Sequence, residues 1–169
     1  AKYILKLPDK SNERAKRGSI CHLVFECLGN PRHKKHYTKI LRSKNIFASE
    51  PVKRLVLKHA RKEQVDDQEN IDLIKDMTLN GLNYDFFGKE NGKPTKSISE
   101  KEFNIEVDED GKKYAIRGFI DKLFLYKKKS LAVIRDFKSS KQIFKGKEIT
   151  NNLQDLMYSL AVKHLYPEY

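Results

Sequence analysis

The chain has 169 residues, of which 38% are hydrophobic, and this favours one globular domain with a sizeable core and little room for a second. Its apolar runs are too short to cross a membrane and its charged N-terminus lacks the centre of a signal peptide, so we expect a soluble, intracellular protein. Two cysteines are too few for a disulfide framework or a four-thiolate metal site. The net charge of +12 favours a polyanionic partner.

An N-terminal arm and a helix are the first predicted elements. Residues 1–16 are polar around Pro8 and predict an extended arm. Residues 18–28 carry apolar side chains at helical spacing, with Ser19 as the N-cap and Gly29 as the stop signal. On this helix His22 lies on an otherwise apolar surface, where a histidine is more often a core residue than a ligand.

Positive charge is concentrated between residues 31 and 62, where eleven Lys or Arg accompany a single acid, Glu50. We predict helices at about residues 33–42 and 51–62, with Pro51 in a first-turn position. A basic segment of this kind favours nucleic-acid contact, although excess lysine can also serve only solubility. The residues that we expect to contact nucleic acid here are Arg32, Lys34, Lys35, Lys39 and Arg42.

A third amphipathic helix is predicted at residues 66–79, ended by Asn80 and Gly81. Residues 83–96 are rich in Gly, Asn and charge without clear periodicity, which predicts a mobile loop. The loop contains three aromatic side chains that could stack on unpaired bases. The favoured interpretation is that they anchor the loop on the core; they are Tyr84, Phe86 and Phe87.

A strand is predicted at residues 98–107, followed by a turn at residues 108–111 whose sequence, Asp-Glu-Asp-Gly, is a strong turn signal. The next strand starts at Lys112. If the turn is centred between Glu109 and Asp110, the pairing of the two strands follows by counting outward from that point.

This pairing concerns two glutamates of the first strand. Glu100 is expected opposite Phe119, and Glu102 opposite Arg117, with which it can form an ion pair. Both glutamates then share the face of Asp121. Glu100 is the nearer of the two and is therefore the preferred candidate ligand for a metal on that face.

Residues 117–138 predict a second hairpin, because apolar stretches flank a lysine-rich turn. If this hairpin is centred between Lys128 and Lys129, Asp121 lies opposite Asp136. Lys138 follows two residues later and faces the same way. The sequence therefore places two carboxylates and an ammonium group together.

Both faces of this hairpin are otherwise apolar, so its carboxylates should be buried, and buried carboxylates require compensation. Oxygen ligands favour Mg²⁺ or Mn²⁺, with a phosphodiester as the expected substrate. The metal would activate a water, and the lysine would orient the nucleophile or neutralise the transition state. For an isolated Asp-x-Lys, a hairpin of solvated charges is the commoner explanation.

The C-terminal part predicts a loop at residues 139–148 and a helix at about residues 151–166. In the loop, Lys141 and Lys145 are expected to contact phosphates. On the helix, Gln154 and Tyr158 lie one turn apart and face the same way. By composition alone they are an ordinary half-buried polar pair.

Several of these residues, taken together in order, resemble the RecB-type branch of the PD-(D/E)xK nucleases. The matching segments are Gly-Ser-x-x-His-x-x-x-Glu at 18–26, Ser-Glu-Lys-Glu-Phe at 99–103, Gly-Phe-Ile-Asp at 118–121, Asp-Phe-Lys at 136–138 and Gln-Asp-Leu-Met-Tyr at 154–158. Five features in the right order are far more specific than any one of them.

The resemblance implies a metal-dependent DNA nuclease that holds one or two Mg²⁺ or Mn²⁺ ions. The implied ligands are His22, Glu100, Asp121, Asp136 and the carbonyl of Phe137. Lys138 is then the catalytic lysine, while Gln154 and Tyr158 line the active site, where they bind the DNA backbone or orient the lysine. Some relatives carry an iron–sulfur cluster held by four cysteines, and this chain lacks the ligands for one.

The predicted architecture is a single α/β domain with a restriction-endonuclease-like core: a mixed central sheet containing an antiparallel meander, flanked by helices. No P-loop or dinucleotide fingerprint occurs, which argues against ATPase activity. The expected activity is sequence-independent exonuclease action on DNA ends or single strands. A structure-specific endonuclease and a non-catalytic nucleic-acid-binding module remain as alternatives.

Overall fold

The structure is a computed structural model that describes residues 10–138 and 153–169. The chain divides into two compact units, Ala1–Phe86 and Phe87–Tyr169, called here the helical unit and the sheet unit. Each is described by itself, and the organisation of the chain as a single domain stays a prediction. In the described part of the chain, no helix has the length and apolar character needed to cross a membrane.

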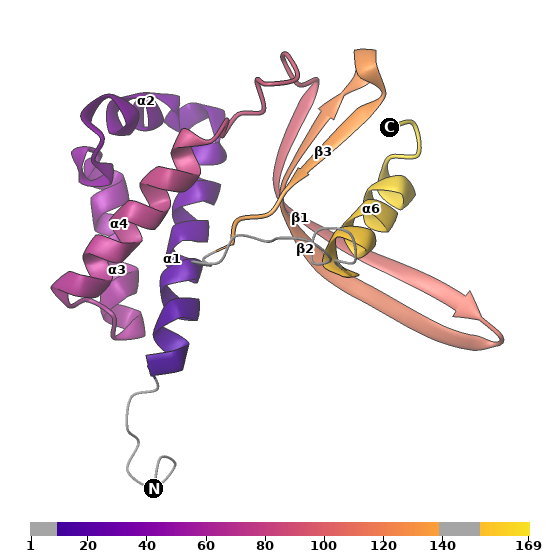
Figure 1. Cartoon of the computed structure of the whole chain (residues 1–169), viewed down its shortest axis with the longest axis horizontal. Coiled ribbons are helices and arrows are strands. Elements are labelled where there is room, and N and C mark those ends of the chain that lie inside the picture. Colours follow the sequence, from indigo (N-terminus) through magenta and orange to yellow (C-terminus); the bar gives the residue numbers. More distant parts are fainter. Residues whose placement is uncertain (1–9, 139–152) are drawn as a thin grey trace, which may run out of the picture. The chain divides into compact units, whose positions relative to one another are not determined.

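The described residues of the helical unit form four α-helices, α1 (Lys10–Gly29), α2 (Lys34–Ser43), α3 (Glu50–Glu63) and α4 (Gln68–Asn83), and two short 3-10 helices, η1 (Pro31–His33) and η2 (Ile46–Ala48) (Figure 1). Each α-helix contributes fully buried apolar side chains. These include Ile20, Val24, Leu28, Ile40, Val56, Ile74 and Leu82. The apolar side chains that the sequence spaces at helical intervals therefore pack together in a core.

Helix α1 begins much earlier than the sequence predicted. It already includes Lys10, so that residues 10–16 are helical and not an extended arm, while residues 1–9 lie outside the described part. Ser19 lies inside the helix, where its hydroxyl donates to the Ala15 carbonyl at 3.1 Å, and is not an N-cap. The first turns are held by tertiary contacts, because Lys16 Nζ donates to the Glu63 carbonyl at 2.7 Å.

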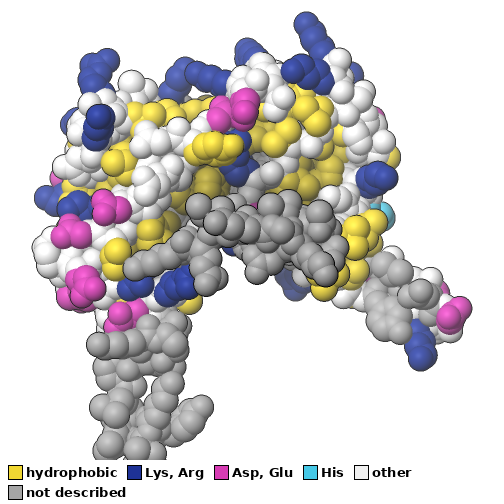
Figure 2. Space-filling view, in the orientation of Figure 1, with side chains coloured by type: hydrophobic (Ala, Val, Ile, Leu, Met, Phe, Trp, Pro, Cys, Tyr) yellow, Lys and Arg dark blue, Asp and Glu magenta, His cyan; other side chains and the backbone are white. Residues whose placement is uncertain are grey.

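The basic segment folds as predicted into helices, α2 and α3. Pro51 lies in the first turn of α3, where its missing N–H costs no hydrogen bond. The spacing of Lys35, Lys39 and Arg42 places them on one face of α2, and all three are exposed. Figure 2 shows basic side chains standing out from the surface along the edge that α2 occupies in Figure 1.

Helix α4 continues past the predicted stop at Asn80 and Gly81 and ends at Asn83. Gly81 has a packing role, because a Cβ atom at this position would overlap the ring of Phe25 on α1. A glycine that looks like a helix terminator therefore lets two helices approach closely.

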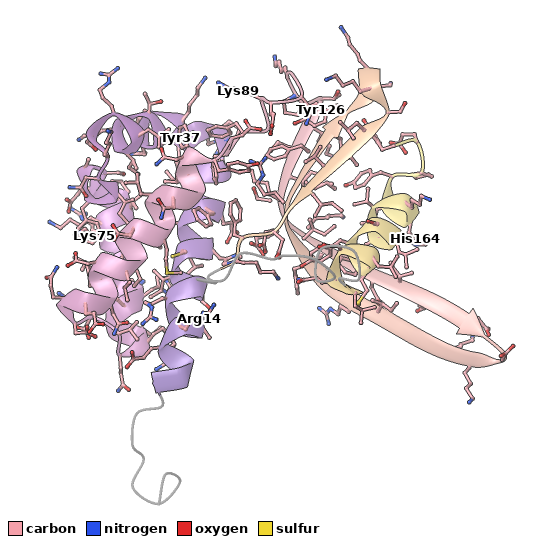
Figure 3. All side chains as sticks on the ribbon, viewed as in Figure 1. Arg14, Tyr37, Lys75, Lys89, Tyr126 and His164 are labelled. Carbon is pink, nitrogen blue, oxygen red and sulfur yellow. The ribbon has the colours of Figure 1, made fainter. Side chains whose placement is uncertain are left out.

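The aromatic residues that follow α4 differ in their surroundings. Phe86 is 1% exposed, and its ring stacks at 5.6 Å between centroids on that of Tyr37, which is labelled in Figure 3. Tyr84 is 67% exposed. The expectation that these aromatics anchor the loop is confirmed for Phe86, whereas Tyr84 lies at the surface.

The sheet unit contains β1 (Lys96–Glu109), β2 (Lys112–Tyr126) and β3 (Leu131–Arg135), joined as an antiparallel sheet in the order β1-β2-β3, and helix α6 (Leu153–Leu165) (Figure 1). All pairings among the described strands are antiparallel, so the described residues show the predicted meander but no parallel strand. Helix α6 packs on the sheet through Tyr158, Ala161 and Val162.

The register of the first hairpin differs from the prediction. Its turn is centred between Asp110 and Gly111, whose positive φ angles of 52° and 74° match a two-residue Asp-Gly turn. Glu102 consequently pairs with Phe119, and the same register places Glu100 opposite Asp121. The observed partner of each β1 residue is two positions from the predicted one. Because side chains alternate with a period of two, Glu100 still faces the same side as Asp121.

The register of the second hairpin is as predicted. Lys122 pairs with Arg135 and Leu123 with Ile134, which is the pairing expected for a centre between Lys128 and Lys129. Strand β3 ends at Arg135, and Asp136 follows immediately.

The two long strands change the face that they turn toward the core in the middle of their length. Toward one end, Ile98 and its partner Leu123 contribute to the core that α6 covers. Toward the hairpin tip, Phe103 and Ile120 contribute to that same core, although their positions in the alternation are opposite. Between them lies Glu100, with a left-handed φ of 51°. This strained residue interrupts the alternation at the acidic pair.

Candidate active site

Four polar side chains of the sheet unit form a closed ring of contacts. Lys138 Nζ lies 2.6 Å from Asp136 Oδ2 and donates to Gln154 Oε1 at 2.5 Å. Gln154 Nε2 donates to the Tyr158 hydroxyl at 2.6 Å, and that hydroxyl donates to Asp136 Oδ1 at 3.3 Å. Side chains from the segment directly after β3 thus contact side chains of α6. This agrees with the predictions that Asp136 and Lys138 face the same way and that Gln154 and Tyr158 do so.

The sequence separates these four residues into two local segments. Asp136 and Lys138 are two positions apart in extended chain after β3, and Gln154 and Tyr158 are one turn apart on α6. Tyr158 is 7% exposed, and its ring meets Phe103 edge to face at 6.1 Å between centroids. The packing of Tyr158 therefore holds the polar groups of α6 in an orientation that faces Asp136.

A second pair of carboxylates belongs to the two long strands. Carboxylate oxygens of Glu100 and Asp121 lie within 4.8 Å of each other. Asp121 Oδ2 also accepts a hydrogen bond of 2.7 Å from the backbone N–H of Phe137. This bond links β2 to the chain segment that carries Asp136 and Lys138.

Glu102 does not take part in this pair. Its Oε1 accepts from Arg117 Nε at 2.8 Å and lies 2.5 Å from an Arg117 terminal nitrogen. The predicted ion pair is confirmed, although Arg117 is diagonal to Glu102 and not directly opposite. Glu100 is accordingly the strand β1 acid that lies beside Asp121.

The site raises the pKa of Tyr158 from 10 to about 12. Burial is the largest cause, since it penalises the phenolate, and the nearby Asp136 carboxylate acts in the same direction. The hydrogen bond from Gln154 acts in the opposite direction. Tyr158 is therefore a neutral hydrogen-bond donor at physiological pH.

The oxygen atoms of Glu100, Asp121 and Asp136 are hard donors of the type that Mg²⁺ and Mn²⁺ prefer. Two of these carboxylates approach within 4.8 Å, a separation that one divalent cation can bridge. Like charges placed this close are stabilised by such a cation. The donor set of the sheet unit thus fits a divalent metal.

The other predicted site residues belong to the helical unit or fall outside the described part. His22 is half-buried on α1 of the helical unit, with its ring edge to face with Phe25 at 6.3 Å between centroids. The side chains of the helical unit that were predicted to contact nucleic acid are all exposed: Arg32, Lys34, Lys35, Lys39 and Arg42. Lys141 and Lys145 fall outside the described residues. The roles of all of them stay predictions.

Lys122 was not singled out by sequence analysis. It is 1% exposed, with Nζ 5.4 Å from the ring centroid of Phe87 and 5.8 Å from that of Phe124. Burial, and then the charge of Arg135, lower its pKa to about 8. The available signal was a lysine inside an otherwise apolar strand, next to Asp121.

The segment before β1 covers this part of β2. The Tyr126 hydroxyl donates to the Gly88 carbonyl (Figure 3), and Thr95 N–H donates to the Leu125 carbonyl at 2.7 Å. A Cβ atom on Gly88, whose φ is +66°, would overlap the Phe124 ring. These contacts bury the surface of the strand that carries the site.

Comparison with known proteins gives one match. The model of the PD-(D/E)XK nuclease superfamily matches residues 1–169, the full length of the chain. No curated protein and no solved structure matches the chain.

The superfamily match agrees with the sequence motifs and with the fold. The α/β architecture with an antiparallel meander, predicted as a restriction-endonuclease-like core, is confirmed. The match does not distinguish the RecB-type branch from others. With a match over all of its residues, this chain belongs to the PD-(D/E)XK nuclease superfamily.

Proposed function

We propose that the chain is a RecB-type, Mg²⁺- or Mn²⁺-dependent deoxyribonuclease that acts as a sequence-independent exonuclease on DNA ends or single strands. Such an activity belongs to DNA replication, recombination or repair. The observation that supports it best is the ring formed by Asp136, Lys138, Gln154 and Tyr158. It joins an ammonium group to Asp136, the acid that directly follows β3, and the neighbouring strand β2 carries a second acid, Asp121.

In this proposal the metal is held by Glu100, Asp121, Asp136 and the Phe137 carbonyl, with His22 as a further ligand. A bound divalent cation supplies an activated water and stabilises negative charge on the phosphorus. The hydrogen bond from Phe137 N–H to Asp121 Oδ2 fixes the orientation of that carboxylate. The Asp121 carboxylate is thereby held in one orientation toward the proposed metal.

The remaining residues of the ring have distinct roles. Lys138 is proposed to position the attacking water and to neutralise charge on the phosphate. Gln154 holds the ammonium group, and Tyr158 holds Asp136 through a neutral hydroxyl. All three are contributed by elements of one unit.

The exposed basic side chains of α2 are proposed to bind DNA phosphates. Lys35, Lys39 and Arg42 share one helix face, so they can follow a phosphate backbone without reading its bases. Affinity that arises in this way does not depend on sequence and falls steeply with salt. This expectation agrees with an enzyme that acts at DNA ends.

The test is incubation of end-labelled linear DNA and covalently closed circular DNA with Mg²⁺ or Mn²⁺. The wild type is compared with Asp136→Asn, which keeps the shape of the side chain but removes its charge. Asp155→Asn is the matched control, because Asp155 is an exposed carboxylate on α6. We expect cleavage of linear DNA only, reduced by at least about 10³-fold in Asp136→Asn and unchanged in the control.

Other outcomes would select a different function. Cleavage of circular DNA that depends on Asp136 would favour an endonuclease. Tight DNA binding without cleavage in either metal would favour a non-catalytic binding module and would overturn the proposed chemistry.

A further inference from the structure

Both oxygens of Asp136 already have partners in the sheet unit. Lys138 Nζ lies 2.6 Å from Oδ2, and the Tyr158 hydroxyl donates to Oδ1 at 3.3 Å. The shorter contact is the one that carries charge, and charge-assisted contacts are the stronger kind. A cation that binds Asp136 therefore meets a carboxylate whose charge is already compensated by Lys138.

Lys138 has a second, uncharged acceptor. Its ammonium group donates to Gln154 Oε1 at 2.5 Å. The Gln154 amide is held in turn, because its Nε2 donates to the Tyr158 hydroxyl at 2.6 Å and therefore points away from Lys138. Tyr158 is buried, so the helix keeps the amide oxygen directed at the ammonium group.

We propose that Lys138 competes with divalent metal for Asp136, and that Gln154 is the positioning residue that retains Lys138 when it gives up that carboxylate. This inference rests on the proposed function, since it concerns the metal of that same site. An ammonium group and a divalent cation on one carboxylate repel each other, whereas the neutral amide of Gln154 can hold Lys138 without occupying an acid.

The two residues should consequently affect metal affinity in opposite directions. Without Lys138, Asp136 loses its competing cation and should bind metal more tightly. Without Gln154, Lys138 keeps Asp136 as its only acceptor among the described residues and should release that carboxylate less readily, so that metal binds more weakly. If the two residues only supported the fold, replacing either one would change metal affinity in the same direction, or would not change it at all.

The experiment is calorimetric titration of the full chain with Mn²⁺ in the absence of DNA. The proteins are the wild type, Lys138→Met, Gln154→Met, the double variant and Ser159→Ala, an exposed α6 control whose hydroxyl bonds its own helix at 2.8 Å. Methionine keeps the length of both side chains and removes their polar atoms. Circular dichroism confirms that each variant is folded.

We expect Mn²⁺ to bind about tenfold more tightly to Lys138→Met and about threefold or more weakly to Gln154→Met, with no change in Ser159→Ala. The double variant should equal Lys138→Met, because Gln154 acts through Lys138.

Three results would overturn the proposal. Affinity that is unchanged or lower in Lys138→Met removes the competition. Affinity that is unchanged or higher in Gln154→Met, or an effect of Gln154 that persists without Lys138, removes the positioning role. A wild type that binds no Mn²⁺ at millimolar concentration instead contradicts the metal-dependent function itself, and is distinguishable because all variants would then be silent.

Discussion

The two units of the chain place their polar side chains in different ways. In the helical unit, the buried Asn70 is hydrogen-bonded at the start of α4: its N–H groups donate to Asp67, the N-cap of α4, and Arg17 of α1 donates to its side-chain oxygen. In the sheet unit, polar side chains from β1, β2, the segment after β3 and helix α6 converge. The first arrangement closes a helix end, and the second concentrates charge where a cation can bind.

The basic side chains that were predicted to bind DNA differ in their surroundings from two lysines of the sheet unit. Arg32, Lys34, Lys35, Lys39 and Arg42 of the helical unit are exposed and spread over the surface. In the sheet unit, Lys138 and Lys122 are instead held near acids or aromatic rings. Under the proposed function, the exposed charge of α2 serves DNA binding, and the polar groups that converge in the sheet unit serve the chemistry.

The prediction with the largest expected effect concerns the stability that each unit gains from its buried core. Leu28 of the helical unit and Leu123 of the sheet unit are both 0% exposed. We expect Leu28→Ala and Leu123→Ala each to lower the free energy of unfolding by about 2–5 kcal/mol, measured by urea denaturation. A cost below about 1 kcal/mol for either would show that the site can collapse around the smaller side chain.

The next prediction sharpens the division between binding and chemistry. Replacing Lys35, Lys39 and Arg42 together by Gln should weaken binding to DNA about 10- to 100-fold at low salt and reduce the salt dependence by roughly three charges. Fluorescence anisotropy with an Asp136→Asn background measures this without cleavage.

The matched control for this triple variant of α2 removes three positive charges from the sheet unit instead. Lys127, Lys128 and Lys129 are exposed and form the short helix η3 between β2 and β3. Replacing these three by Gln should change affinity by less than about threefold. Equal losses in the two triple variants would show that net charge, and not the α2 surface, determines binding.

A smaller effect concerns strain at the acidic pair. Glu100 and Asp110 both have left-handed backbones, with φ of 51° and 52°. Glycine relieves such strain, so Glu100→Gly and Asp110→Gly should each change stability by about 1 kcal/mol or less, in the stabilising direction. Thermal unfolding measures this difference.

Only one of these two glycine variants should affect the metal. Glu100→Gly removes a proposed ligand and should weaken Mn²⁺ binding about tenfold or more, whereas Asp110→Gly, at the hairpin tip, should not. If Glu100→Gly binds Mn²⁺ as well as the wild type, Glu100 is not a ligand.

The smallest expected effect is a pH dependence of stability. The pKa of Tyr158 is raised to about 12 in the folded chain, so folding favours the neutral phenol. Its contribution is fully present below pH 10, the ordinary pKa, and is lost as pH rises through about 12, on the order of 1 kcal/mol. Denaturation between pH 9 and 12 should therefore weaken the wild type more steeply than Tyr158→Phe, and parallel curves would contradict this.

Much of the sheet unit could be predicted because its signals are local. The lysine-rich turn set the register of the second hairpin correctly, and so placed Asp121 near Asp136. The first hairpin was misplaced by one position at its turn, because several consecutive polar residues can form the two-residue loop. The facing of Glu100 was still right, since moving a hairpin centre by one residue moves each partner by two.

The errors in the helical unit arose from tertiary contacts. Residues 10–16 contain no apolar stripe, and the helix there is held by Lys16 and Arg17 through contacts with distant residues. Gly81 resembled a stop signal, but its lack of a side chain serves the ring of Phe25. Propensity and spacing carry no information about such partners.

The left-handed Glu100 also has a consequence for how such a chain can change over time. The strands on either side of it bury opposite sets of positions in a single core. Loss of the one codon for Glu100 would bring the hydrophobic positions of β1 into regular alternation and remove an acid in the same event. Under the proposed function, a single deletion would therefore make the apolar alternation of β1 regular and remove a proposed metal ligand at the same time.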